Sequence, residues 1–299
     1  MGRFDILREI ERLDPERDHA RIMHLSFGHE FCWDSVRALE IALYRTYCVP
    51  SISALLDRTG EFYQHTQRRY DDTAILVAEM CEWGYEEGRG RQALERMNWA
   101  HGHYQIANSD FLYVLSTFIF EPIRWIDAFA WRETCRNEKL AYYGFWRGIG
   151  TRMGIRDIPE SYEAFEQWSR DYERETFRFA ETNQRVGAAT RDLFASWVPR
   201  FLAPVVRYGV YAALDTAMLE AFGFPKPLPL TRRFLRGALR MRGKLVRWLP
   251  PRRTPHFFTD DKNRTHPCGY EIPGLGPPRL IAAERRKAEA AARETSPPR

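Results

Sequence analysis

Apolar residues recur at helical spacing along most of the chain, and almost no stretch alternates in the way that predicts a β-strand. Val36, Leu39 and Leu43, for example, lie at i, i+3 and i+7 before Pro50 ends the pattern. The sequence contains no internal repeat. It therefore predicts an all-α fold, and its 299 residues are enough to bury a large core.

One of these helices, expected at residues 61–83, continues its apolar stripe into polar residues. Arg69, Asp72, Thr73, Leu76 and Met80 lie at i, i+3, i+4, i+7 and i+11, which places all five on one helix face. If Leu76 and Met80 face the core, Arg69 points inward too and needs an anion, from Asp72 or from a bound molecule. The simpler interpretation is an ion pair between Arg69 and Asp72 and a Thr73 hydroxyl bonded to its own helix. The pattern leaves both open.

A second helix is expected at residues 91–107, and it carries His101 on the same face as Leu94 and Met97. His101 and His103 stand two residues apart, so on a helix they project about 200° from one another and cannot bind one metal ion together. His101 alone remains in the core-facing stripe. A lone imidazole there is either a structural residue or the single axial ligand of a haem, whose propionates would supply the missing anion.

Proline, glycine and serine predict further boundaries. A helix that begins near residue 108 is expected to stop or kink at Pro122, and residues 144–159 are expected to form a loop. Ser161 is expected to cap a charged helix that runs to Phe179. Residues 186–222 are predicted to be mostly helical and buried.

The net charge of +5 and the pI near 9.0 come mainly from the stretch between Arg232 and Arg253. Elsewhere both signs are mixed, which argues against a nucleic-acid partner. Basic and apolar residues alternate at helical spacing over 231–249, so this stretch predicts a basic amphipathic helix. Such a helix either lies on an anionic membrane surface or docks on the domain with its basic face in water. The sequence does not choose between them.

We divide the chain by composition into three parts: a helical domain at 1–225, a Pro-rich spacer with the basic helix at 226–253, and an irregular, loosely ordered tail at 254–299. No apolar run reaches the roughly 20 residues that cross a bilayer. The N-terminus has no apolar signal core, and the five cysteines form no CxxC pair. We therefore expect a cytoplasmic protein with reduced thiols, with peripheral membrane contact through 231–249 as the open alternative.

The common enzyme motifs are missing: the sequence has no nucleotide-binding glycine motif, no GxSxG turn and no HExxH helix. Four other segments occur in an order that carries a resemblance. They are residues 67–73 (QRRYDDT), 96–101 (RMNWAH), 106–116 (IANSDFLYVLS) and 121–125 (EPIRW). Together they resemble the MpaB-type oxygenases, relatives of the rubber oxygenase (latex clearing protein) catalytic domain, over about residues 15–225.

The resemblance implies an all-helical, globin-like domain that encloses a pocket for haem b. His101 matches the proximal histidine that holds the iron, and Arg69 and Thr73 match an arginine and a threonine near the haem. Rubber-cleaving relatives carry a lysine just before the threonine, where this chain has Asp72. We take Arg69, Asp72 and Thr73 as catalytic candidates, with His101, Arg69 and Thr73 binding the cofactor. Glu61 is a candidate for the catalytic carboxylate.

The function that the resemblance implies is a haem b-dependent oxygenase. It would use O2 to attack C=C bonds of a hydrophobic, isoprenoid or prenylated substrate, giving carbonyl products. The alternative is a non-catalytic haem- or lipid-binding protein at a membrane surface.

Overall fold

The computed structural model describes residues 2–294, and every regular element among them is a helix. The all-α prediction is confirmed, whereas the globin-like haem pocket stays a prediction. Within these residues, no helix combines the length and the apolar character that crossing a membrane requires. The elements are α1 (Asp5–Arg12), α2 (His19–Leu25), the π-helix η1 (Ser26–Glu30), α3 (Cys32–Thr46), α4 (Pro50–Thr59), α5 (Glu61–Gln64), α6 (Thr66–Trp83), α7 (Gly88–His101), α8 (Asn108–Phe129), α9 (Arg136–Arg152), α10 (Tyr162–Thr176), α11 (Glu181–Ser196), α12 (Ala203–Ala213), α13 (Thr216–Phe222), α14 (Pro229–Trp248), the 3-10 turns η2 (Phe258–Asp260) and η3 (Ile272–Gly274), and α15 (Pro278–Glu294).

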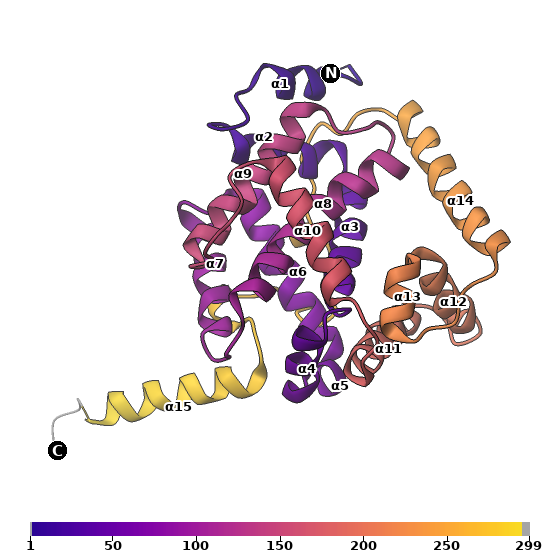
Figure 1. Cartoon of the computed structure of the whole chain (residues 1–299). Helices are drawn as coiled ribbons and strands as arrows, with labels where there is room; N and C mark the ends of the chain where they lie inside the picture. The colour runs from indigo at the N-terminus through magenta and orange to yellow at the C-terminus, as the bar shows by residue number, and fades with distance from the viewer. Residues whose placement is uncertain (1, 295–299) are drawn as a thin grey trace.

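The centre of the fold is built from neighbouring helix pairs. α3 packs along α8, α6 along α7, and α2 along α9, with α10 covering α8 and α9 (Figure 1). Phe120, Tyr142 and Phe145 are fully buried where these pairs meet. Each buried side chain of this size contributes about 1.5–3 kcal/mol relative to its exposed state, so this aromatic core is a substantial source of stability. A second apolar cluster joins α3 to α11 and α13.

Several helix boundaries differ from the prediction. The largest difference is α9, which extends to Arg152 and so occupies the first part of the loop expected at residues 144–159. Gly148 and Gly150 lie inside it, and any side chain there would collide with Tyr85 and Leu115, respectively. These glycines allow close packing, and that packing overrides their low helix propensity.

Other boundaries also shifted. α8 continues through Pro122 to Phe129. α7 ends at His101, several residues before the expected end. The predicted cap is confirmed, because the Ser161 hydroxyl accepts a 3.1 Å hydrogen bond from the backbone N–H of Ala164 at the start of α10.

The C-terminal region is more ordered than its composition suggests. Phe257, Ile272 and Leu275 are buried and belong to the main apolar core. α15 then extends away from the bundle at the lower left of Figure 1. The expected irregular tail thus contains a helix and a buried stretch that its composition does not indicate, while its loose ordering stays a prediction and residues 295–299 lie outside the described part of the chain. The division at residues 225 and 253 stays a prediction.

Candidate functional site

A cavity lies where α6, α7 and α8 meet, with walls that are mostly apolar and aromatic. Its apolar lining includes Leu76, Val114, Phe118 and Trp146. The polar residues at the wall include all the candidates from the sequence. Among them are Glu40, Glu61, Arg69, Tyr70, Asp72, Thr73, His101, Tyr104 and Asp110. An apolar cavity with a few converging polar groups is typical of a small-molecule site.

α6 places Arg69 and Thr73 one turn apart in this wall. The Arg69 guanidinium donates a hydrogen bond through Nη1 to the Thr73 hydroxyl, and that hydroxyl donates to the Arg69 carbonyl at 2.8 Å. The predicted back-bond of Thr73 to its own helix is therefore present. No carboxylate of the described residues pairs with Arg69, so its charge is available to an anion in the cavity.

Asp72 is held by other partners. Its carboxylate accepts hydrogen bonds from Arg68 Nε at 3.3 Å, His266 Nε2 at 2.7 Å and the backbone N–H of Gly276 at 2.9 Å. The expected pair between Arg69 and Asp72 is absent from the described structure. Asp72 lines the cavity but ties α6 to the C-terminal segment, a connection that no local pattern in the sequence indicates.

His101 is the last residue of α7 and lies in the cavity wall. Its Nδ1 atom is buried without a hydrogen-bond partner among the described residues, and its ring meets that of Phe111 edge to face at 5.4 Å. Burial, with a smaller contribution from the charge of Arg69, lowers the pKa of His101 to about 4. The imidazole is therefore neutral at physiological pH and retains a lone pair for a ligand bond.

His103 does not lie in the cavity wall with His101. It follows the end of α7, is exposed, and its Nδ1 lies 2.8 Å from the Trp99 carbonyl oxygen. The two imidazoles therefore do not share a site. Among residues 2–294, no group of three or more His, Cys, Asp or Glu side chains is arranged to hold a metal ion.

Two carboxylates in the wall complete the site. Glu61 is buried, as a candidate for proton transfer should be. Glu40 accepts hydrogen bonds from Tyr70 Oη at 2.5 Å and from Arg37 Nη2 at 2.7 Å, and burial raises its pKa. Sequence reasoning missed the pairing of Glu40 with Tyr70, because the two residues come from different helices, α3 and α6, and lie 30 residues apart in sequence.

The site thus combines a neutral imidazole, an arginine that has no carboxylate partner within residues 2–294 and an apolar wall. Such a site can hold a hydrophobic molecule with an anionic group and can offer one nitrogen to a metal that brings its other ligands with it.

Three relatives in the genus Penicillium are similar to this chain. The ER-bound oxygenase mpaB' of Penicillium brevicompactum is 28% identical over 242 residues, which are 75% of this chain and 57% of that protein. The ER-bound oxygenase mpaB of Penicillium roqueforti (strain FM164) is 35% identical over 162 residues, 48% of this chain and 54% of the relative. The ER-bound oxygenase mpaB of Penicillium brevicompactum is 30% identical over 225 residues, 67% of this chain and 56% of the relative. The chain thus spans a little over half the length of these relatives.

A match over most of the helical bundle agrees with these similarities. Residues 36–248 match the family described as ER-bound oxygenase mpaB/B'/rubber oxygenase, catalytic domain. This range includes the cavity-lining parts of α6, α7 and α8 and continues to the end of α14. The chain belongs to the family of the mpaB/B' and rubber oxygenase catalytic domains.

Proposed function

We propose that this protein is a haem b-dependent oxygenase that uses O2 to attack a C=C bond of a hydrophobic, isoprenoid or prenylated substrate. The observation that carries the proposal is the neutral imidazole of His101, whose buried Nδ1 has no partner among the described residues, in the apolar cavity of an oxygenase-family chain. Family membership supports the reaction class, and the cavity supports the hydrophobic substrate.

The residues in the cavity wall fit a haem. A buried ring nitrogen without a partner costs about 1–3 kcal/mol, and ligation of the ring to iron would offset that cost. The guanidinium of Arg69 lies in the cavity wall and has no carboxylate partner in the described part of the chain. A haem propionate is the kind of anion that it would pair with. His101 would therefore hold the iron, and Arg69 would bind the carboxylate edge.

The remaining side chains orient and protect the reactants. Thr73 holds the Arg69 guanidinium in place through their hydrogen bond. The aromatic and aliphatic wall binds an apolar chain and excludes water. Haem, when bound, supplies the O2 chemistry that side chains lack. Asp72 keeps α6 and the C-terminal segment together, and Glu61 or the pair of Glu40 and Tyr70 is positioned to hold a proton at the wall.

The absorbance spectrum tests the cofactor. The full chain expressed with adequate haem is expected to show a Soret band, and His101→Ala is expected to lose it. His103→Ala is the matched control and is expected to keep the band, because His103 is exposed and lies outside the wall. A wild-type protein without a Soret band would overturn the haem proposal, and a normal spectrum from His101→Ala would overturn the ligand assignment.

The pH dependence of binding gives a second readout. Because the pKa of His101 is about 4, protons do not compete for its lone pair until the pH falls toward that value. Haem affinity is therefore expected to stay nearly constant from pH 8 to pH 5. A decline centred near pH 6.5, the ordinary value for histidine, would show that the ring is not held in the buried, neutral state.

Oxygen uptake distinguishes the enzyme from the alternative of a non-catalytic haem- or lipid-binding protein. Haem-loaded protein is expected to consume O2 and form carbonyl products with at least one member of a panel of prenylated compounds. A haem-loaded protein that binds such compounds without consuming O2 would support the alternative.

We also propose that the protein makes peripheral contact with a membrane through residues 231–249. Two observations support this: apolar side chains of α14 are exposed, and basic side chains lie beside them.

A further inference from the structure

α14 packs against the bundle with one side. Leu235, Leu239 and Val246 are partly buried on this side, and Gly243 is buried against the backbone of Phe129 and Ala130 at the end of α8. A side chain at Gly243 would collide with both of those carbonyl oxygens. The packed side therefore uses the apolar residues that a helix docked on a protein requires.

The opposite side of α14 is also apolar, but it is exposed. Leu230, Phe234, Met241, Leu245 and Trp248 are 77%, 76%, 55%, 62% and 86% exposed. At about 100° per residue these five positions fall within roughly 60° of one another around the helix axis. We call them the α14 stripe. A continuous exposed stripe of large apolar side chains marks an interaction surface.

Basic residues border the α14 stripe. Residues 226–253 contain ten Lys and Arg residues and no Asp or Glu. Five of them line a groove between α13 and α14, and no acidic residue lines it. Lys226 pairs with Glu220 at 2.9 Å and Arg232 donates to the Leu214 carbonyl at 2.9 Å. The other three, Arg233, Arg236 and Arg240, have no carboxylate partner within the described structure, so their charges are available to a ligand.

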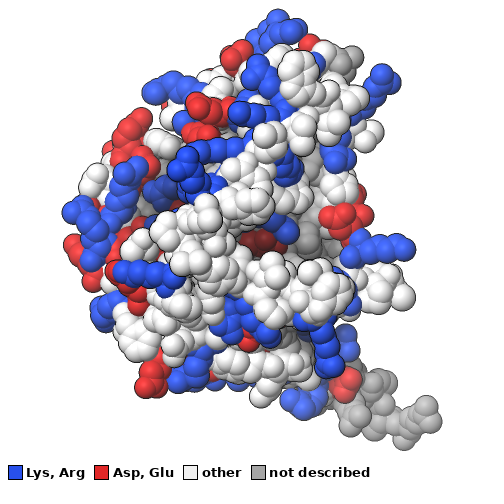
Figure 2. All heavy atoms as spheres, turned by 90° about the vertical axis from the view of Figure 1, so that its right-hand side faces the viewer, with Lys and Arg blue, Asp and Glu red and all other residues white. Residues whose placement is uncertain are grey.

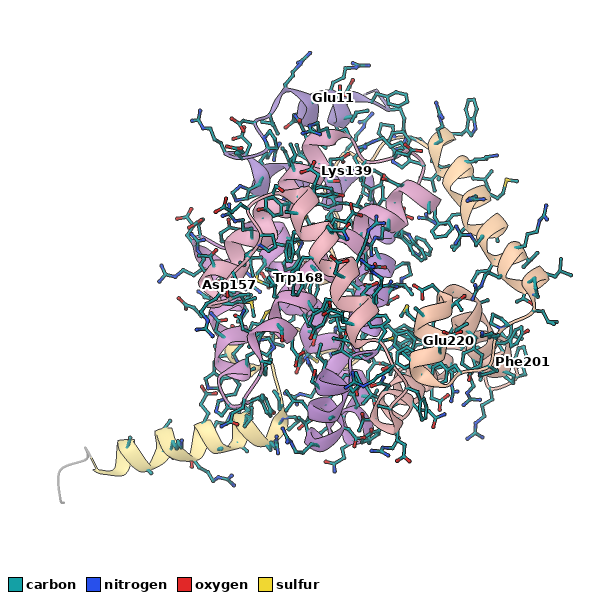
Figure 3. All side chains as sticks on the ribbon, viewed as in Figure 1. Glu11, Lys139, Asp157, Trp168, Phe201 and Glu220 are labelled. Carbon is teal, nitrogen blue, oxygen red and sulfur yellow. The ribbon has the colours of Figure 1, made fainter. Side chains whose placement is uncertain are left out.

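A neighbouring element extends the apolar surface on this side of the molecule. Phe201, just before α12, is 78% exposed, and Val205, within α12, is 66% exposed. Figure 3 shows Phe201 at the same outer edge as α14, and α12 packs on α14. Figure 2 views this face directly and shows a band of uncharged atoms with Lys and Arg around it.

We propose that this face binds the surface of an anionic phospholipid bilayer. The α14 stripe lies in the boundary between headgroups and acyl chains, and Arg233, Arg236 and Arg240 in the groove bind lipid phosphates. The inference rests on the membrane contact proposed above and deepens it, because it names the lipid chemistry and the residues that recognise it.

Charge decides between possible occupants. A second copy of this chain would bring two basic surfaces together, which like-charge repulsion opposes. A nucleic acid would satisfy the arginines but would leave the exposed Phe, Leu and Trp side chains in water. An anionic bilayer satisfies both groups, since it offers phosphates at the height of the arginines and acyl chains beneath the stripe.

The same orientation places the catalytic cavity near the lipid. α14 packs on α8, and other residues of α8 line the cavity. A membrane-bound chain would therefore hold its apolar cavity one helix away from a bilayer in which hydrophobic substrates dissolve.

Vesicle flotation of the full chain tests the proposal. Vesicles of phosphatidylcholine alone are compared with vesicles that also contain phosphatidylserine. The triple variant Arg233→Gln, Arg236→Gln, Arg240→Gln is expected to lose on the order of 100-fold in affinity for the anionic vesicles, at about 1 kcal/mol for each basic residue near the surface. The matched control removes three charges from α15, as Arg285→Gln, Arg286→Gln, Lys287→Gln, and is expected to bind like wild type.

The stripe has its own variant, Phe234→Ser, Leu245→Ser, Trp248→Ser, which is expected to lose binding to anionic vesicles while keeping the wild-type circular dichroism spectrum. If wild-type protein binds both vesicle types equally, or if the arginine variant keeps its affinity, the groove does not bind lipid phosphates. A wild-type dimer in solution that the stripe variant abolishes would identify a second copy as the occupant instead. No binding to either vesicle would overturn both this inference and the proposed membrane contact. The Soret band and oxygen uptake are measured without vesicles, so the oxygenase proposal is tested separately.

Discussion

α14 and the segment at residues 255–277 follow one another in sequence after the first thirteen α-helices, and they attach to the helical bundle in opposite ways. α14 is a regular helix of 20 residues in which only Gly243 is buried. Residues 255–277 contain just two short turns, yet Phe257, Ile272 and Leu275 are all buried in the main core. Regular secondary structure therefore does not measure how firmly a segment is held.

Hydrogen bonds to α6 explain the difference. The segment at 255–277 donates to four carboxylates of α6: Thr259 Oγ1 to Glu82 at 2.7 Å, Thr265 N–H to Asp71 at 3.0 Å, His266 to Asp72 at 2.7 Å, and Tyr270 Oη to Glu79 at 2.6 Å. α14 instead relies on a few apolar contacts, on the hydrogen bond from Arg232 to the Leu214 carbonyl and on the pair of Arg242 with Asp34. One segment completes the wall of the cavity, and the other leaves its apolar stripe free for a partner.

The largest expected effect comes from a leucine in each segment. Leu275→Ala removes a fully buried side chain and is expected to lower the free energy of unfolding by about 2–5 kcal/mol, because a cavity remains in the core. Leu245→Ala is the matched control, since Leu245 is 62% exposed. Urea denaturation of both variants measures the difference. Similar midpoints for the two would contradict the contrast between the segments.

A second large effect is expected at Asp72. Asp72→Ala leaves His266 and the backbone N–H of Gly276 without the carboxylate that accepts their hydrogen bonds. The substitution is expected to lower the free energy of unfolding by about 1–3 kcal/mol. Hydrogen exchange of amides 265–276 should become faster, while Asp72→Asn, which keeps one acceptor oxygen, should change it less. Unchanged exchange together with lost oxygen uptake would instead indicate a direct role of the carboxylate in the reaction.

The sequence predicted the parts of the fold and site that depend on local spacing. Helical periodicity places Arg69, Thr73 and His101 on core-facing stripes, the family resemblance places them near one cofactor, and all three line the cavity. The partners of Asp72 could not be predicted, since His266 and Gly276 lie 194 and 204 residues away in sequence. Hydrogen bonds between residues so far apart in sequence leave no pattern in the local sequence around either partner.

The same limit explains the errors in secondary structure. Gly148 and Gly150 indicate a loop when only neighbours in sequence are considered. In the folded chain they allow α9 to approach Tyr85 and Leu115, so the contact and not the propensity decides the helix. Likewise, the pattern at 231–249 showed one apolar face, whereas the structure divides those residues between a packed side and the exposed α14 stripe.

A smaller effect is expected where α14 is anchored. Arg242 Nη1 lies 3.0 Å from Asp34 Oδ1, and Asp34 is buried with Trp125 Nε1 as a second donor at 3.2 Å. Arg242→Ala is expected to lower the free energy of unfolding by about 1–2 kcal/mol at pH 7. The loss is limited because Trp125 still donates a hydrogen bond to the Asp34 carboxylate. Arg240→Ala, which loses no ion pair, is the control.

The loss of stability in Arg242→Ala should depend on pH, because Asp34 is titratable. Burial raises the pKa of Asp34, and the charge of Arg242 opposes that rise. Without Arg242 the folded-state pKa rises further, so the folded chain binds a proton that the unfolded chain releases near pH 4. Stability of the variant relative to wild type is therefore expected to fall as the pH rises from 4 to 7. A difference independent of pH would show that packing, not the ion pair, holds α14 at this point.

The smallest effect on stability is expected from the most exposed residue of the α14 stripe. Trp248 is 86% exposed, so Trp248→Ser should change the free energy of unfolding by less than about 0.5 kcal/mol. Trp131, which is only 4% exposed, provides the contrast, and Trp131→Ser should lose several times more. On anionic vesicles the order reverses: Trp248→Ser should weaken binding about tenfold or more, because a tryptophan buries about 150–250 Å² of surface when it enters the interface. A residue that is neutral to folding but strongly coupled to vesicle binding is what separates a surface kept for a partner from a surface that is merely solvated.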